Sequence, residues 1–306
     1  MSKKPDISVI IPHYNQWEFL ADALESMRAQ IYPPSEIIIV DDASDFFDES
    51  ELRKAFPDLP LKIFRHAINR GVAAARNTGL KTAKGNYVAL IDADDCWDKR
   101  HLAFFAEALK KNPGMLVYVA GSRYFCNECL PGESVDASSE VRAVNYFDWA
   151  VTEPLAVNSS NIVLSREAVE TTGFFDEHLP VFEDIDYWIR LGRKFPVYVN
   201  RNITVLIRLD TPGSLSKNLS LYRTESLKYF FNKHFEGMQS DREERFLHLN
   251  LYGVVLQYKK QGRSDFPVCL RGRLSEKFLG FRQKLFLRLP SFWVKLLAGW
   301  RKRMMC

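Results

Sequence analysis

Three aspartates lie close together in the run YVALIDADDCW at residues 87–97. Asp92, Asp94 and Asp95 directly follow an apolar segment that is typical of a buried strand. Like charges held within a few ångströms raise one another's pKa, so such a group is best tolerated where a cation binds. Carboxylate oxygens suit Mg²⁺ or Mn²⁺, which commonly bind one or two carboxylates together with substrate phosphates. The alternative is a solvated acidic loop whose aspartates cap helices.

A second acidic cluster opens the segment FEDIDYWIRLGRKF at residues 182–195, which predicts an amphipathic helix. Glu183, Asp184 and Asp186 fall in its first turn. Because the helix dipole favours negative side chains there, this cluster also has a purely structural explanation.

The elements that must position these acids alternate between predicted strands and predicted helices. The strands are short apolar, β-branched runs, at residues 7–12, 36–42, 61–66 and 86–92, with a fifth around residues 115–121. Such alternation predicts an α/β fold with a parallel, doubly wound sheet. Ligands bind such sheets at the carboxyl ends of the strands.

Polar residues stand where that rule would place a ligand site. The first strand ends in Pro12, His13, Tyr14 and Asn15, the second in Asp41 and Asp42, and the fourth in Asp92 and Asp94. Turn residues and helix caps could explain any one of these strand ends. Three together favour a single crevice lined by acids and a hydrogen-bonding aromatic side chain.

The composition is that of a globular protein, with 46% hydrophobic and 26% charged residues among 306. The five cysteines are scattered, and the pair Cys126 and Cys129 has no second pair to complete a zinc site. MSKKPD leads into a strand pattern without a secretory signal, and no apolar run reaches membrane-spanning length. We therefore expect a cytoplasmic protein.

The C-terminal region is strongly basic. Residues 259–306 contain thirteen Lys or Arg and two acids, a net charge of +11, so the other residues carry −7 of the total +4. Phe, Leu, Trp293 and Trp300 are interspersed with these charges, and Pro290 divides the segment. This pattern predicts an amphipathic region at an anionic membrane surface. The alternative is a C-terminal helix packed on the protein; no nucleic-acid module is recognisable.

Six motifs occur in order along the chain: SVIIPHYN, IIIVDDASD, NRGVAAARNTGL, GNYVALIDADD, GFFDE and FEDIDYWIRL. With them, the chain resembles the family 2 inverting glycosyltransferases of the GT-A fold over residues 5–215. The resemblance implies a doubly wound mixed sheet flanked by helices in a catalytic domain at residues 1–215. A C-terminal helical extension is expected at residues 216–306.

The resemblance also implies a nucleotide-sugar donor, usually a UDP-sugar. Pro12 and Tyr14 would line the base and ribose pocket, and Asn15 would support that loop. Asp42 would accept a hydrogen bond from the uracil N–H. Arg76 would face the nucleotide, with a surface helix arginine as the alternative.

The remaining implied roles concern the reaction. Asp92 would contact the ribose or a metal-bound water, and Asp94 would ligate Mn²⁺ or Mg²⁺. Asp184, beside Glu183, matches the family's catalytic base. An inverting displacement needs a carboxylate that deprotonates the acceptor hydroxyl opposite the leaving group, and a metal that neutralises a diphosphate leaving group can replace a general acid.

The chain departs from the family pattern in two places. The segment RLDTPGSLS lacks a histidine ligand, and Arg208, Ser214 and Ser216 could hold the diphosphate instead. No QxxRW segment follows the Glu183–Asp184 pair, which favours addition of one sugar per encounter. The expected acceptor is a lipid-linked or surface-polysaccharide glycan, used at the inner face of the cell membrane.

Two other functions remain open from the sequence. A nucleotidyltransferase would share the sheet and metal carboxylates, but it should carry a Gly-rich phosphate loop where this chain has PHYNQWEF. A non-catalytic nucleotide-sugar-binding protein would be expected to lack Asp92, Asp94 or Asp184, and all three are present.

Overall fold

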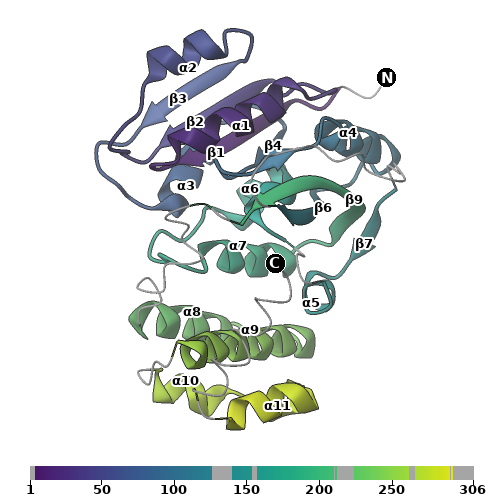
Figure 1. Cartoon of the computed structure of the whole chain (residues 1–306). Helices are drawn as coiled ribbons and strands as arrows, with labels where there is room; N and C mark the ends of the chain where they lie inside the picture. The colour runs from purple at the N-terminus through teal and green to yellow at the C-terminus, as the bar shows by residue number, and fades with distance from the viewer. Residues whose placement is uncertain are drawn as a thin grey trace. The chain divides into compact units, whose positions relative to one another are not determined.

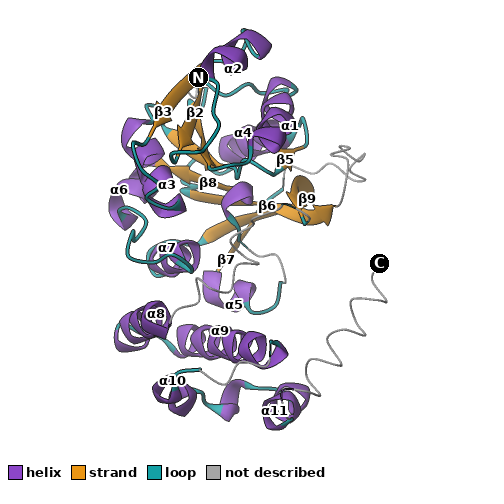
Figure 2. Cartoon of the chain, turned by 60° about the vertical axis from the view of Figure 1, so that its left-hand side comes forward, coloured by secondary structure: helices purple, strands orange, loops and turns teal. Residues whose placement is uncertain are grey.

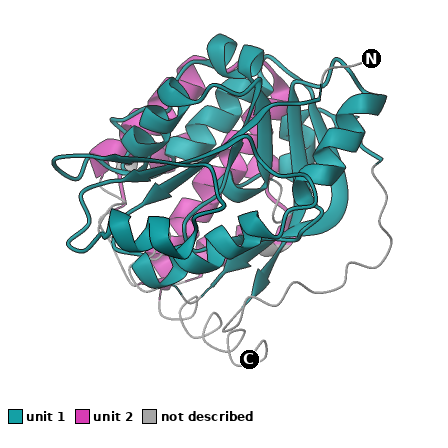
Figure 3. Ribbon diagram, turned by 90° about the horizontal axis from the view of Figure 1, so that it is seen from above, with its two compact units in different colours: residues 1–219 teal, residues 220–306 magenta. Residues whose placement is uncertain are grey.

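The structure is a computed structural model that describes residues 4–125, 140–153, 157–209, 211, 224–261, 266–289 and 291. The chain forms two compact units, residues 1–219 and 220–306, which are coloured separately in Figure 3. Ser214, Ser216, Cys126, Cys129, Pro290, Trp293 and Trp300 lie outside the described residues. No helix in the described ranges has both the length and the apolarity to cross a membrane.

The first unit is built on one mixed sheet in the order β3-β2-β1-β4-β8-β6-β9-β5, with β7 paired to β9 (Figure 1). The neighbours β3, β2, β1 and β4 are parallel, as the sequence predicts, whereas β8 runs antiparallel to both β4 and β6. The strands are β1 (Ile7–His13), β2 (Glu36–Asp41), β3 (Leu61–Arg65), β4 (Tyr87–Leu90), β5 (Cys96–Trp97), β6 (Val117–Phe125), β7 (Arg142–Val144), β8 (Ile162–Ser165) and β9 (Val197–Arg208).

Helices cover both faces of this sheet. In Figure 2, α3 and α6 lie on one side of the strands and α1 and α4 on the other. Every residue of β1 and β2 is buried, which explains why both strands are nearly continuous apolar runs. The helices of this unit are α1 (Trp17–Arg28), α2 (Glu49–Ala55), α3 (Val72–Thr82), α4 (His101–Lys111), α5 (Tyr146–Ala150), α6 (Arg166–Thr172) and α7 (Glu183–Gly192).

Helix α3 approaches β1 closely because residue 79 is glycine. A Cβ on Gly79 would lie 2.3 Å from Cγ2 of Ile10. Real side chains do not approach so closely, so the contact depends on the missing methyl group. This packing sets the depth of α3, which carries Arg76, against the central strand.

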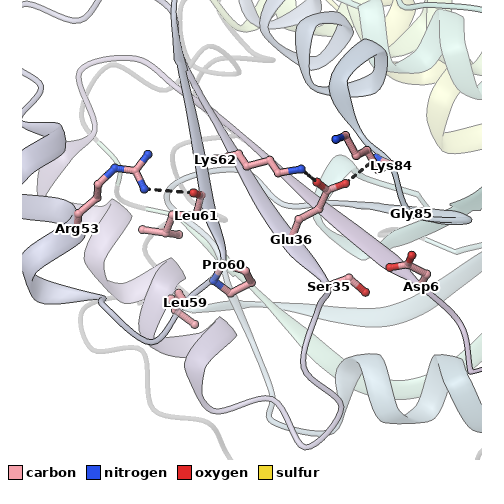
Figure 4. A pocket seen from close by; sticks show the side chains of 10 residues that line it. All are labelled: Asp6, Ser35, Glu36, Arg53, Leu59, Pro60, Leu61, Lys62, Lys84 and Gly85. Carbon is pink, nitrogen blue, oxygen red and sulfur yellow. Dashed lines mark hydrogen bonds and ion pairs between the residues drawn. The ribbon is translucent and has the colours of Figure 1, made fainter.

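A polar network around Glu36 lies at the amino ends of the strands. Its carboxylate accepts hydrogen bonds from Ser8 Oγ (2.5 Å) and from the Lys84 backbone N–H (2.6 Å), and it pairs with Lys62. Burial raises the pKa of Glu36, but these hydrogen bonds outweigh it and lower the pKa below its usual value. A cavity of about 490 Å³ lies beside this network (Figure 4). It is at the opposite end of the strands from the acids that the sequence singled out.

The second unit is helical, as expected for the C-terminal extension. It contains α8 (Thr224–Glu236), α9 (Asp241–Lys260), α10 (Val268–Arg273), a short 3₁₀ helix η4 (Glu276–Phe278) and α11 (Phe281–Arg288). Helices α10 and α11 lie along α9 in both Figure 1 and Figure 2.

Candidate active site at the carboxyl edge of the sheet

The loop after β1 is tied to the loop after β2. The Asn15 backbone N–H donates to Ser44 Oγ (2.8 Å), and the Asn15 side chain exchanges hydrogen bonds with Asp45 (2.8 and 3.0 Å). Pro12 is buried within β1, whereas 46% of Tyr14 is exposed beside the loop. Asn15 therefore fastens the two loops, and Tyr14 is the residue of this group that a ligand can reach.

Asp41 is a structural residue. Its carboxylate accepts hydrogen bonds from Ser44 Oγ (2.5 Å) and His13 Nδ1 (2.9 Å), and it pairs with Arg65 (3.0 Å). Burial raises the pKa of Asp41, but the bonds from His13 and Ser44 outweigh it and lower the pKa. With no exposed surface, this carboxylate holds the loop after β2 rather than a ligand.

Asp42, the expected uracil acceptor, also has protein partners that the sequence did not reveal. Its two oxygens accept the backbone N–H groups of Arg70 (2.9 Å) and Gly71 (2.7 Å), and one pairs with His66 Nδ1 (2.6 Å). Gly71 has φ = 89°, a conformation that favours glycine, and caps α3. Asp42 thus anchors the turn that starts α3. Its role toward a base stays a prediction, since a carboxylate has further acceptor sites.

The three aspartates after β4 differ in surroundings. Asp95 is 4% exposed; it accepts hydrogen bonds from Ser160 Oγ and from the Arg208 backbone N–H (2.9 Å). The Asp92 side chain is 37% exposed. Burial and the charge of Asp92 raise the pKa of Asp94, and burial, Asp92 and Asp94 raise that of Asp95. A bound divalent cation would reduce this mutual repulsion of the carboxylates.

Arg76 joins the two acidic clusters that the sequence analysis found separately. Nη2 donates to Asp92 Oδ1 (2.8 Å) and Nη1 to Glu183 Oε1 (2.8 Å). The side chain is only 5% exposed and its guanidinium lies 5.5 Å from the centre of the Phe175 ring. Burial lowers the pKa of Arg76, but the two carboxylates outweigh it and raise the pKa. The surface-arginine alternative is therefore wrong.

The acids at the start of α7 have three different environments. Asp186 is fully buried and paired with Arg190 (2.9 Å), so it is structural. Burial and the charge of Asp184 raise the pKa of Glu183 to about 7, although Arg76 opposes the shift. Asp184 is half-buried and accepts a hydrogen bond from the Ile185 N–H (2.7 Å).

Asp184 lies within electrostatic range of Asp92. Burial raises its pKa, Arg76 opposes this, and the charge of Asp92 raises it further. A carboxylate with a raised pKa binds a proton more readily, which suits a general base. The structure thus brings Asp92, Arg76, Glu183 and Asp184 into one electrostatic cluster.

Arg208, a candidate for the diphosphate, is held by the protein in the described structure. Nε donates to the Asp94 backbone carbonyl (3.1 Å) and Nη2 to Asp22 (2.7 Å). The guanidinium lies between the Phe19 and Phe125 rings, at 4.8 and 4.7 Å, and its side chain is 7% exposed. Arg208 therefore stabilises the Asp94–Asp95 turn through hydrogen bonds to both residues.

Two further sets of contacts join segments that are far apart in the sequence. Asn77 of ARNTGL exchanges hydrogen bonds with the Phe175 backbone of GFFDE (2.8 and 2.9 Å) and donates to Glu177 (2.9 Å). Trp97 Nε1 donates to the Ser160 carbonyl (2.7 Å). These residues position the segment before α7 and the aspartate turn, and no local pattern in the sequence indicates the pairings.

The donor set fits a hard divalent cation that completes its coordination on substrate oxygens. Among the described residues, no group of three or more His, Cys, Asp or Glu side chains is arranged to hold a metal. Asp94 and Asp92 offer two carboxylates, which is the usual number for Mg²⁺ bound with substrate phosphates.

The model of "Glycosyl transferase family 2" matches residues 8–137. An "Uncharacterized glycosyltransferase" of Rickettsia felis is 25% identical over 72% of this chain and 37% of its own length. The chain thus spans little more than a third of that relative. The Escherichia coli "UDP-Glc:alpha-D-GlcNAc-diphosphoundecaprenol beta-1,3-glucosyltransferase WfaP" is 28% identical over 69% of this chain and 80% of its own.

Two solved structures share the fold. S. aureus TarS 1-349 in complex with UDP-GlcNAc has a TM-score of 0.60 and 17% identity, over 95% of this chain and 88% of its own. The mannosyltransferase PcManGT from Pyrobaculum calidifontis, in complex with GDP-Man and Mn²⁺, has a TM-score of 0.59 and 20% identity, over 93% and 84%. The mixed sheet with flanking helices is therefore the GT-A fold that the sequence predicts. The family model over residues 8–137 supports the resemblance to glycosyltransferase family 2 that the six motifs carry.

Proposed function

We propose that this chain is a metal-dependent, inverting glycosyltransferase that moves one sugar from a nucleotide-sugar, most simply a UDP-sugar, to an acceptor hydroxyl. The observation that carries the proposal is the Asp92–Arg76–Glu183 bridge, with hydrogen bonds of 2.8 Å on both sides. It joins Asp92, on the side of the donor diphosphate, to Glu183, whose neighbour Asp184 is half-buried and suited to an acceptor hydroxyl. The named complexes of TarS and PcManGT with nucleotide-sugars support the donor class.

Asp94 and Asp92 would hold Mn²⁺ or Mg²⁺. When bound, the cation would neutralise the charge that develops on the departing nucleoside diphosphate. Arg208 fixes the backbone of the Asp94 turn through its bond to the Asp94 carbonyl (3.1 Å). Tyr14, which is exposed at the end of β1, is available for the base and ribose.

Asp184 would act as the base. Its carboxylate takes the proton of the acceptor hydroxyl as the hydroxyl oxygen attacks the anomeric carbon, and the bond to the diphosphate breaks on the opposite face. Glu183 is paired with Arg76 (2.8 Å), so it orients the start of α7 instead of taking the proton. The half-buried position of Asp184 leaves it reachable by an acceptor.

A lipid-linked or surface-polysaccharide glycan is the proposed acceptor, used at the inner face of the cell membrane. The name of WfaP describes transfer to a sugar on diphosphoundecaprenol. That relative and the basic C-terminal region are the two supports for this acceptor class.

The test of the base is Asp184→Asn, with Glu170→Gln on the exposed surface of α6 as the matched control. We expect kcat to fall by at least about a hundredfold in Asp184→Asn, with UDP affinity nearly unchanged and full activity in the control. Normal turnover of Asp184→Asn would contradict the assignment of the base.

The test of the metal uses UDP binding by calorimetry, with Mn²⁺ or with a chelator. We expect UDP affinity to depend on the cation in the parent and to lose that dependence in Asp94→Ala, because one of the two carboxylates that would hold the cation is gone. Equal UDP affinity with and without the cation in the parent protein would contradict the metal site.

A further inference from the structure

Helix α11 presents apolar side chains outward, which is the reverse of the usual pattern. Phe281 is 83% exposed and Leu285 49% exposed, and the Arg288 side chain is 73% exposed. These residues are spaced i, i+4 and i+7, so they share one face of the helix. The solvent face of an ordinary surface helix is polar, so an exposed Phe, Leu and Arg stripe requires a different explanation.

The orientation of α11 is fixed by contacts within its unit. Lys259 of α9 donates to the Phe286 and Leu289 carbonyls at the end of α11 (3.4 and 3.0 Å), and it also contacts the Leu287 carbonyl. Phe278, just before α11, stacks on His248 of α9 at 5.0 Å. The outward stripe is therefore the face left after α11 has packed.

The segment that contains α11 also exposes basic side chains. Arg271 and Arg273 of α10, Lys277 of η4 and Arg288 are all exposed. The one exposed acid among residues 266–289 is Glu276, which pairs with Arg288 (3.3 Å). The surface thus combines exposed apolar side chains with a net positive charge, which is complementary to anionic lipid headgroups over an apolar interior.

We infer that the face of α11 formed by Phe281, Leu285 and Arg288 is a docking surface for an anionic lipid bilayer. Phe281 and Leu285 would enter the headgroup region, and Arg288 and the other exposed basic side chains of residues 266–289 would contact lipid phosphates. The inference extends the proposed function, because a surface of this kind would hold the enzyme beside a lipid-linked acceptor. It names the residues that insert, which composition alone could not do.

The experiment measures co-sedimentation of the full chain with vesicles of phosphatidylcholine, alone or mixed with phosphatidylglycerol. We expect binding to the mixed vesicles that weakens with salt. Phe281→Ser/Leu285→Ser should lower the partition coefficient about tenfold or more. Phe281→Trp should retain binding, since Trp suits the membrane interface. Met238→Ser removes an exposed apolar side chain outside α11 and is the matched control.

A charge variant keeps the test independent of the apolar pair. Arg273→Gln/Lys277→Gln should weaken binding to the mixed vesicles about tenfold or more, and both sets of variants should keep the parent's thermal midpoint. Equal partitioning of parent and Phe281→Ser/Leu285→Ser would overturn the inference. So would a parent dimer that becomes monomeric in this variant without any lipid binding, because a second copy would then be the occupant.

Donor hydrolysis, measured on the same samples, separates the two proposals. Loss of vesicle binding with unchanged hydrolysis would leave the enzyme assignment intact and remove only the docking surface. If the parent binds vesicles but hydrolyses no nucleotide-sugar, the docking surface is supported and the proposed glycosyltransferase activity is contradicted.

Discussion

Replacement of Arg76 by methionine tests whether one guanidinium holds both acidic clusters together. Methionine keeps an unbranched apolar stem near the Phe175 ring but removes the charge between Asp92 and Glu183. Removing one partner of a buried ion pair costs about 3–5 kcal/mol. The Asp92 side chain is 37% exposed and can be solvated again, whereas the Glu183 side chain is 11% exposed and cannot. We therefore expect the lower end, about 3 kcal/mol of unfolding free energy.

The loss of unfolding free energy in Arg76→Met should depend on pH, because Glu183 titrates. Burial and Asp184 raise its folded pKa to about 7, above the unfolded value, so the folded protein binds the extra proton. The parent's stability falls as pH rises through that pKa. Without Arg76 the pKa of Glu183 moves higher still. The penalty of Arg76→Met should therefore be larger at about pH 8 than at about pH 6, where Glu183 is mostly neutral.

Urea denaturation at the two pH values provides the measurement. A loss of about 3 kcal/mol corresponds to about 6–12 °C in the melting midpoint of a unit this size. Glu183→Gln should recover part of the loss in the Arg76→Met background, because neighbours in one network are not additive. Arg53→Met breaks an exposed pair with Glu49 and should cost about 0.5 kcal/mol or less. If Arg76→Met costs no more than this control, with no pH dependence, the bridge is not real.

Three further predictions concern stability and are read from urea midpoints. Ala43 has φ = 62°, so Ala43→Gly should stabilise the protein by about 1 kcal/mol, as relief of left-handed strain exceeds the added unfolded-state entropy. Burial lowers the pKa of His101 to about 3, so on acidification the unfolded state binds a proton that the folded state does not. The free energy of unfolding therefore falls as pH drops below about 6.5. His101→Leu should make the free energy of unfolding less dependent on pH in this range. Gly79→Ala places a methyl group against Ile10 and should cost about 1–3 kcal/mol.

The parallel half of the sheet could be predicted because its strands are buried on both faces. ISVIIPH and EIIIVD have almost no polar interruption, and that pattern is local in sequence. The order of the other strands could not be predicted in this way. β8 enters between β4 and β6 by antiparallel pairing with both, and apolar periodicity carries no information about which strand is the neighbour.

In the candidate site, too, the sequence predicts some features, and others depend on tertiary contacts. The sequence indicated that acids gather at the strand ends, because the chain reaches the carboxyl edge there. It could not separate Asp95, which faces Ser160 and the Arg208 N–H, from Asp92, which remains partly exposed. Nor could it separate Asp186, paired with Arg190, from Asp184. Only tertiary partners decide which carboxylate is structural.

Backbone strain supports the location of the site independently of its side chains. Among the described residues, Asn15, Ala43 and Phe182 are the non-glycine residues with positive φ, at 52°, 62° and 65°. Each adjoins a residue that was assigned to the site from its chemistry: Tyr14, Asp42 or Glu183. A left-handed conformation costs about 1–2 kcal/mol for Ala43 and Phe182 and less for Asn15, and it persists only where surrounding contacts impose it. Three such residues beside one group of acids show that the fold accepts local strain to place them, and local sequence preference is least reliable at such positions.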